Sequence, residues 1–86
     1  MGAALSTSER RILEAVDDAE RDGHVQLTDV VRRALGQLPG YEFRRGVATL
    51  TERHLLRARV AVKAGGEVGQ VVIEQTTFLG RRAIGR

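Results

Sequence analysis

The chain has no cysteine and no tryptophan, and its aromatic side chains are one Tyr and two Phe. The absence of cysteine excludes disulfide bonds, thiolate nucleophiles and every zinc site with a Cys ligand. So few aromatic rings leave little material for the stacking platforms that bind RNA and single strands. No apolar run approaches the roughly 18 residues of a membrane-spanning helix. The sequence therefore predicts neither a metal-thiolate site nor a membrane protein.

Groups that support catalysis are also scarce. The only histidines are His24 and His54, and neither has a Ser, Asp or Glu partner at a recognisable spacing. We expect His24 to lie in a loop and His54 to end a helix. The adjacent carboxylates Asp17 and Asp18 are expected on a solvated helix face. We therefore expect no enzyme, no cofactor and no metal.

The length of 86 residues suits one domain, which we place at residues 1–86. The charges are unevenly distributed along it. Residues 1–22 hold three basic and six acidic side chains, whereas residues 23–86 hold eleven basic and five acidic ones. Such segregation gives the molecule a directional field and indicates an anionic partner for the basic part. The preference for Arg over Lys suits phosphate and guanine, although a GC-rich coding sequence would produce it as well.

The first helix has a clear start and a clear end. Ser6 and Glu9 have the spacing of a capping box, and Gly23 follows as a stop signal. Between them, apolar residues recur with the helical period at Ile12, Val16 and Ala19. Residues 24–27 are then predicted as a brief extended segment.

Two further helices follow in the basic part. Thr28 is a plausible N-cap for the second, which carries apolar residues as far as Leu38 and ends before the turn at Pro39. The third is expected at about residues 41–53, with its buried side made by Phe43, Val47 and Leu50. Gly46 inside this helix suggests a close approach to a neighbouring helix.

After His54 the apolar period changes from helical to alternating. Leu56, Ala58, Val60 and Val62 are expected to point to one side, and Arg57, Arg59 and Lys63 to the other. Residues 64–67 form a turn signal and residues 71–74 a returning strand. Thr76 or Thr77 is then expected to cap a short last helix that carries Phe78, Leu79, Ala83 and Ile84. These elements together predict an α+β fold.

Three segments resemble bacterial winged helix-turn-helix proteins of the MarR-like and PadR-like groups. LTERHLLRARVAV (residues 50–62) is similar to the end of their recognition helix and the start of the wing. TTFLGRRAIG (residues 76–85) is similar to the segment after the wing, and LSTSERRILEAV (residues 5–16) to a core helix. The resemblance implies a three-helix core, a two-stranded β-hairpin wing, a short C-terminal helix and binding to duplex DNA. It departs at His54, where those groups usually have Gly.

Helix geometry places Arg45, Ala48, Thr49 and Glu52 opposite the buried side of the helix at residues 41–53, with Arg44 and Tyr41 on its flanks. Such a face suits the major groove, because Arg pairs with guanine, Thr with several acceptors and Ala with a thymine methyl group. We therefore expect Arg45, Thr49, Arg44 and Ala48 to read bases. Glu52, and Glu42 in the first turn, argue against DNA because each repels phosphate. The alternative is an ordinary solvated helix face.

The expected wing, at about residues 55–75, carries Arg57, Arg59 and Lys63 in one row. With Tyr41, these residues are expected to contact the DNA backbone. The alternative is that the charges protect the edge of the sheet from pairing with another strand.

The sequence thus predicts a small protein that binds double-stranded DNA, either a transcriptional regulator or an accessory factor in plasmid or phage DNA handling. The alternative is a winged-helix protein-interaction module with an acidic partner. A homodimer is expected because a single domain reads few base pairs, with Phe78, Leu79 and Ile84 of the last helix as the apolar residues that form it. We expect a cytoplasmic, nucleoid-associated protein.

Overall fold

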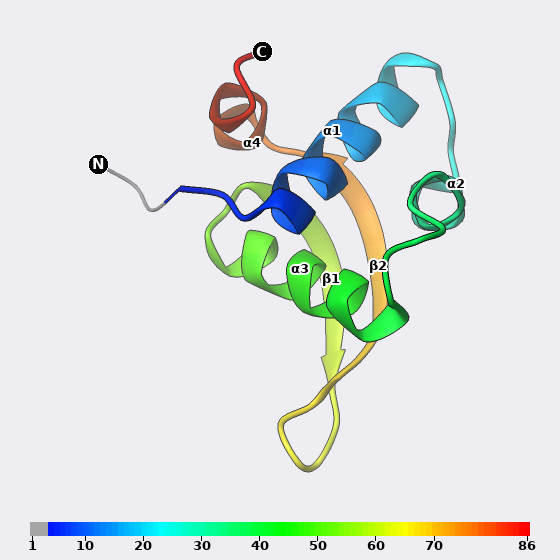
Figure 1. The fold of residues 1–86 in the computed structure, drawn as a ribbon, viewed down its shortest axis with the longest axis vertical. Helices are drawn as coiled ribbons and strands as arrows, with labels where there is room; N and C mark the ends of the chain where they lie inside the picture. The colour runs from blue at the N-terminus through cyan, green and yellow to red at the C-terminus, as the bar shows by residue number, and fades with distance from the viewer. Residues whose placement is uncertain (1–3) are drawn as a thin grey trace.

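The computed structural model describes residues 4–86; residues 1–3 of the expected domain lie outside the described part. Three helices come first, an antiparallel two-stranded hairpin follows, and a short helix ends the order (Figure 1). The elements are α1 (Thr7–Arg21), α2 (Leu27–Ala34), α3 (Gly40–Glu52), β1 (Leu56–Val62), β2 (Val68–Thr76) and α4 (Phe78–Ala83). This order confirms the expected α+β class. No helix within residues 4–86 has the length and apolar character needed to cross a membrane.

The start and end of α1 follow the signals in the sequence. The Ser6 hydroxyl accepts from the Glu9 backbone N–H, and the Glu9 carboxylate accepts from the Ser6 N–H. Gly23 takes a φ of +82° just beyond the helix, in the left-handed region that favours glycine. The apolar side of α1 is completely buried at Ile12, Leu13 and Val16.

The prediction that Thr28 caps α2 is wrong. The N-cap position is Gln26, which makes no side-chain capping bond. The hydroxyl of Thr28 instead accepts a hydrogen bond of 2.8 Å from the backbone N–H of Ile73 in β2. That amide points away from β1 and needs another acceptor, because an unpaired polar group at a buried edge is costly. The extended segment expected at residues 24–27 forms no strand. The start of α2 is joined to the hairpin by the hydrogen bond between Thr28 and Ile73.

The turn between α2 and α3 is held by Arg32. Helix α2 stops at Ala34, earlier than expected, and the Arg32 guanidinium donates 2.8 Å to the Leu38 carbonyl oxygen. The same guanidinium lies 5.5 Å from the centroid of the Phe43 ring in α3. Arg32 therefore holds both the turn and the first part of α3 in place relative to α2.

Helix α3 is the centre of the fold and lies within one residue of its expected bounds. Phe43, Val47 and Leu50 are buried as expected, and so is Gly46. A Cβ atom added to Gly46 would meet the Ile12 side chain of α1. The close approach that the sequence indicated at this glycine is confirmed.

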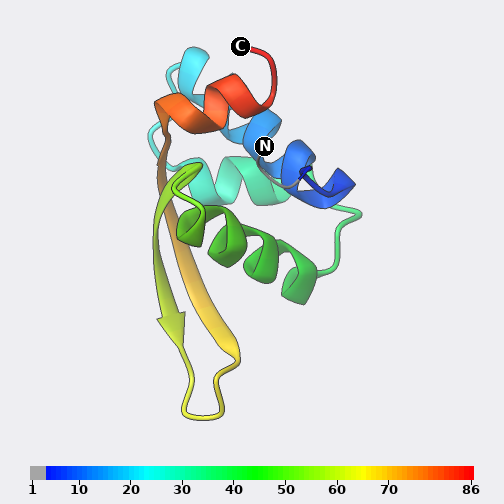
Figure 2. The same cartoon turned by 90° about the vertical axis from the view of Figure 1, so that its left-hand side faces the viewer.

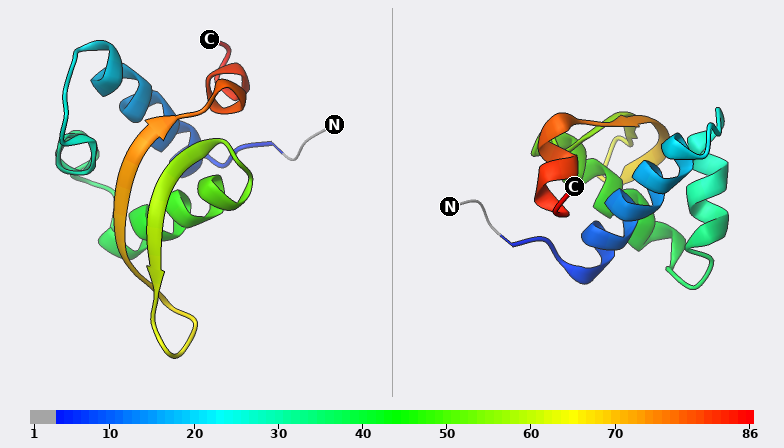
Figure 3. Two further views of the ribbon diagram at one scale, coloured as in Figure 1. Left: turned by 180° about the vertical axis from the view of Figure 1, so that it is seen from behind. Right: turned by 90° about the horizontal axis from the view of Figure 1, so that it is seen from above.

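The hairpin covers one side of the three helices, and its tip extends beyond α3 (Figures 2 and 3). His54 precedes it with a φ of +62°, which confirms its expected place at the end of the helix. Leu56, Ala58 and Val60 alternate toward the helices, but Val62 is 65% exposed and does not continue the inward row. Val62 lies near the tip, where the hairpin extends beyond α3 and no helix of residues 4–86 covers it (Figure 2). The register also shifts between Val60 and Val62, with the extra residue on β2.

Helix α4 packs on α1. Its N-cap is Thr77, one of the two expected positions, and the Thr77 hydroxyl accepts from the Gly80 N–H. Beyond it, the Arg86 guanidinium lies 2.9 Å from the Asp17 carboxylate and 2.7 Å from Asp18. Asp17 is only 2% exposed. The expectation of a solvated Asp17 is therefore wrong, because the end of the described chain folds over this part of α1.

Candidate nucleic-acid interface

The outer face of α3 joins two other parts of the molecule. Tyr41 and Arg45 are exposed, and Ala48 and Thr49 are partly buried on the same side of the helix. Tyr41, Arg45 and Thr49 line a shallow hollow with the start of α1. Tyr41 and Arg45 also line a second hollow with residues 66–68 at the hairpin tip. The expected base-reading face thus continues directly into the tip.

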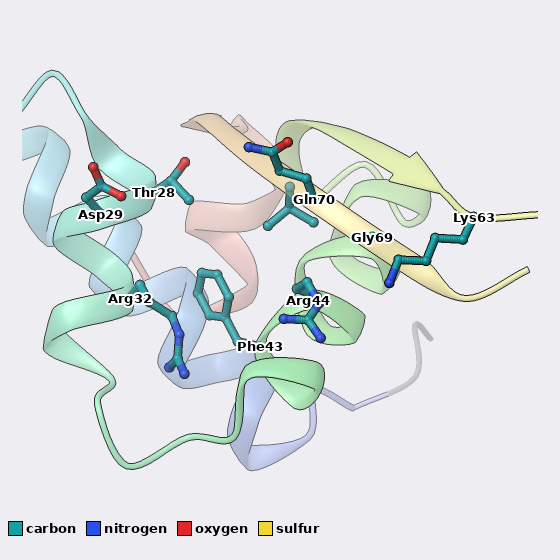
Figure 4. A pocket seen from close by; sticks show the side chains of 9 residues that line it. Thr28, Asp29, Arg32, Phe43, Arg44, Lys63, Gly69 and Gln70 are labelled. Atoms are coloured by element: carbon teal, nitrogen blue, oxygen red, sulfur yellow. The ribbon is translucent and has the colours of Figure 1, made fainter.

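Arg44 lies in a different place from Arg45. It lines an open groove between the start of α2, the first half of α3 and the stem of the hairpin (Figure 4). Lys63 lies across this groove from Arg44, and Phe43 is part of the wall. The neighbouring arginines therefore serve different surfaces, because successive residues of a helix point about 100° apart.

The expected row of Arg57, Arg59 and Lys63 is not formed. Arg57 and Arg59 point outward from the stem, whereas Lys63 lines the groove beside α3. Lys63 lies just beyond β1, which ends at Val62, so its side chain does not continue the alternation of the strand. Lys63 is therefore a neighbour of Arg44 in space, not of Arg57 and Arg59.

The sequence did not indicate the role of Glu74. Its carboxylate lies 3.5 Å from the Nε atom of Arg57 and 3.5 Å from the Nε atom of Arg59. A second register shift, between Arg57 and Ala58, leaves Glu74 unpaired in the ladder and beside both arginines. The outer face of the stem consequently holds two cations and an anion instead of a row of cations.

Most basic side chains of the described chain have partners. Arg10, Arg21, Arg53, Arg57, Arg59 and Arg86 form ion pairs with carboxylates, and Arg32 and Arg81 donate to backbone carbonyl groups. Six Arg and Lys side chains have neither an ion pair nor a hydrogen bond within residues 4–86. Arg11 lies on α1, Arg33 on α2 and Arg82 on α4, whereas the other three, Arg44, Arg45 and Lys63, lie around the first half of α3. We call these three residues the free cation cluster. They surround the first half of α3, next to the hairpin stem and tip.

Titration and metal chemistry do not mark this region. The clear pKa shift among the described residues is that of Arg86, whose pKa is raised by hydrogen bonds to Asp17 and Asp18. That pair lies against α1. Residues 4–86 contain no group of three or more His, Asp or Glu side chains arranged to hold a metal ion.

Comparison of the chain with protein-family models, curated proteins and solved structures finds no match.

Proposed function

We propose that the protein is a winged helix-turn-helix protein that binds duplex DNA, with α3 in the major groove and the hairpin as the wing along the backbone. The free cation cluster is the observation that carries this proposal. Unpaired cations gathered beside an exposed helix suit an anionic polymer, and a helix with its side chains fits the major groove. The order of elements is compatible with the winged-helix layout.

Base reading is assigned to the outer face of α3. Arg45 is exposed and can donate two hydrogen bonds to guanine, Thr49 can pair with several base edges, and Ala48 leaves room for a thymine methyl group. Arg44 lies on the flank of this face and reaches DNA from the groove beside the hairpin.

Contacts with phosphates are assigned to Lys63, to Tyr41 beside the hairpin tip, and to Arg57 and Arg59 on the stem. The last two must first leave Glu74. Exposed ion pairs contribute only about 0–1 kcal/mol each, so phosphates can compete for these arginines.

Within this function the protein would be a small transcriptional regulator or an accessory factor in plasmid or phage DNA handling. A cytoplasmic, nucleoid-associated location belongs to the same proposal. The rival is a winged-helix interaction module, because the free cation cluster would also suit an acidic protein surface.

Fluorescence anisotropy with a labelled duplex of random sequence tests the proposal. We expect binding that weakens steeply between about 50 and 200 mM salt, because each neutralised phosphate releases counterions. The triple variant Arg44→Gln, Arg45→Gln, Lys63→Gln should abolish it, while Arg11→Gln, which removes an exposed charge of α1, should not. Absence of duplex binding at low salt would reject the proposal and favour an acidic protein partner.

Dimerisation through α4 is part of the proposal, with one correction. Phe78 and Leu79 are 65% and 54% exposed, but Ile84 is buried in the core and is not part of such a surface. A two-fold dimer on a pseudo-palindrome would double the number of bases read. Light scattering on cognate DNA should give two chains per duplex, and Phe78→Ser with Leu79→Ser should reduce this to one. A single chain per duplex for the unmodified protein would reject the dimer.

A further inference from the structure

We infer that Arg44 and Lys63 hold the same backbone phosphate in the groove between α3 and the hairpin. Arg44 would then grip the backbone and leave base reading to Arg45, Thr49 and Ala48. This inference rests on the proposed function, since it concerns one contact of the duplex with the protein.

The groove is open and has walls from three elements. Its volume is about 500 Å³, and α2, α3 and the stem of the hairpin all contribute to it. Figure 4 shows Lys63 extending from the hairpin toward α3, where Arg44 stands on the facing wall. A negatively charged group between these two side chains would therefore be reached from both walls at once.

Two glycines leave space for the two cations. A Cβ atom at Gly69 would lie 3.5 Å from Cγ of Lys63 and 3.3 Å from the Ala61 carbonyl oxygen. A Cβ atom at Gly40 would lie 3.2 Å from Nη1 of Arg44. Both cations thus lie beside bare backbone. A side chain at Gly40 would be tight against the Arg44 guanidinium, whereas one at Gly69 would make an ordinary contact with the Lys63 stem.

The other groups around the groove agree with an anion. Arg32 also lines the groove, and its bonds to carbonyl groups and its stacking on Phe43 hold it in place but leave its positive charge un-neutralised. Thr28 and Gln70 offer neutral hydrogen-bonding groups on the rim. Asp29 is the carboxylate among the lining residues, and it lies on α2, at the far end of the groove from Lys63 (Figure 4).

The chemistry of the pair favours phosphate over a base edge. Two cations that face one groove without a partner repel each other, and an anion between them removes that repulsion. The Arg44 guanidinium can form two parallel bonds to phosphate oxygens, while the Lys63 ammonium acts as a point charge. The open groove suits a group on a continuous polymer that passes between α3 and the hairpin.

The salt dependence of binding tests whether one phosphate is shared. The variants are Arg44→Gln, Lys63→Gln and the double variant, with Arg11→Gln on α1 as the matched control, and the probe is a labelled duplex of random sequence. The slope of log affinity against log salt falls by about one for each phosphate that the protein no longer neutralises. If the phosphate is shared, the remaining cation still neutralises it in each single variant. We therefore expect each single variant to weaken binding but to leave the slope nearly unchanged, and the double variant to lower the slope by about one. Arg11→Gln should leave it unchanged.

Circular dichroism and thermal melting establish that each variant is folded.

Three outcomes are distinct. A slope that falls by about one in each single variant and by about two in the double variant means two separate phosphates and overturns the inference. A slope unchanged in the double variant also overturns it, because the pair then neutralises no phosphate. In both cases binding by the unmodified protein leaves the proposed function standing. If the unmodified protein binds no duplex at low salt, the proposed function fails and this inference fails with it.

Discussion

Gly46 of α3 lies so close to Ile12 of α1 that a Cβ atom at position 46 would be 2.6 Å from Cδ1 of Ile12. Ile12 is completely buried, so it has little room to move away. This contact sets the distance between the two helices and with it the position of the outer face of α3.

Gly46→Ala should lower the free energy of unfolding by about 1 kcal/mol. Overpacking a core costs roughly 1–3 kcal/mol, and this outweighs the gain of about 1 kcal/mol from better helix propensity. The control is Gly36→Ala, where the added Cβ atom would make an ordinary contact of 3.5 Å with the Arg33 carbonyl oxygen. Denaturant titration should show a loss for position 46 and none for position 36. Equal stability of the two variants would contradict the close packing at Gly46.

Asp17→Asn should lower the free energy of unfolding by about 1–3 kcal/mol, because a buried acceptor loses its charge-assisted bonds to Arg21 and Arg86. Asp18→Asn is the control; Asp18 binds the same Arg86 but is itself exposed, so its loss should cost less than about 1 kcal/mol. Thermal melts compare the two. If both variants have the same melting temperature, the burial of Asp17 does not increase its contribution to stability.

The same pair makes a prediction for pH. The carboxylates raise the pKa of Arg86, so the stabilisation that this group contributes is complete wherever an unfolded Arg is protonated. It is lost only in strongly alkaline solution, as the pH rises through the raised pKa. Between neutral and mildly alkaline pH, we therefore expect the difference in melting temperature between the unmodified protein and Asp17→Asn to stay constant. A steady decline of that difference in this range would show that another group titrates with the pair.

Glu74→Gln should strengthen duplex binding at low salt, by roughly three- to tenfold, if Arg57 and Arg59 contact the backbone. The variant removes a carboxylate that occupies both arginines and repels phosphate. The gain should shrink as salt rises, and stability should change by less than about 1 kcal/mol. Anisotropy at several salt concentrations measures it, with Asp22→Asn, at the exposed C-cap of α1, as the control for the removal of a negative charge. No gain would place the outer face of the stem away from the DNA.

Arg45→Ala should reduce discrimination between sequences. The side chain is exposed on the outer face of α3, where a base contact is worth about 1–3 kcal/mol on a cognate site and little on random DNA. Arg59→Ala, on the stem, should weaken both duplexes alike. Parallel titrations on cognate and random DNA compare the two variants. Equal loss on both duplexes for Arg45→Ala would mean that it grips the backbone and does not read bases.

Local signals in the sequence predicted most of the fold. The capping box at Ser6, the stop at Gly23 and the apolar period of α3 each depend on residues within a few positions, so the sequence alone could show them. The left-handed turn at His54 was predicted for the same reason. These signals placed α1, α3, the hairpin and α4.

Contacts between distant residues could not be predicted in this way. The hydroxyl of Thr28 binds a strand instead of its own helix, and Arg86 covers Asp17 from the other end of the chain. A register shift in the hairpin brought Glu74 beside Arg57, and β1 ended one residue before Lys63, which lines the groove. An extra residue in β2 leaves the alternation of β1 intact, so nothing near the arginines in the sequence indicated that Glu74 would pair with them.

The bond between Thr28 and Ile73 has a consequence for how the protein folds. It connects residues 45 positions apart, and α2, with eight residues and no side-chain cap, is too short to be stable alone. Helix α2 should therefore appear only after the hairpin has closed, and the two should unfold in a single cooperative step. In hydrogen exchange, the amides of α2 and the paired amides of β2 should open with the same free energy, although α3 and β1 lie between them in the sequence.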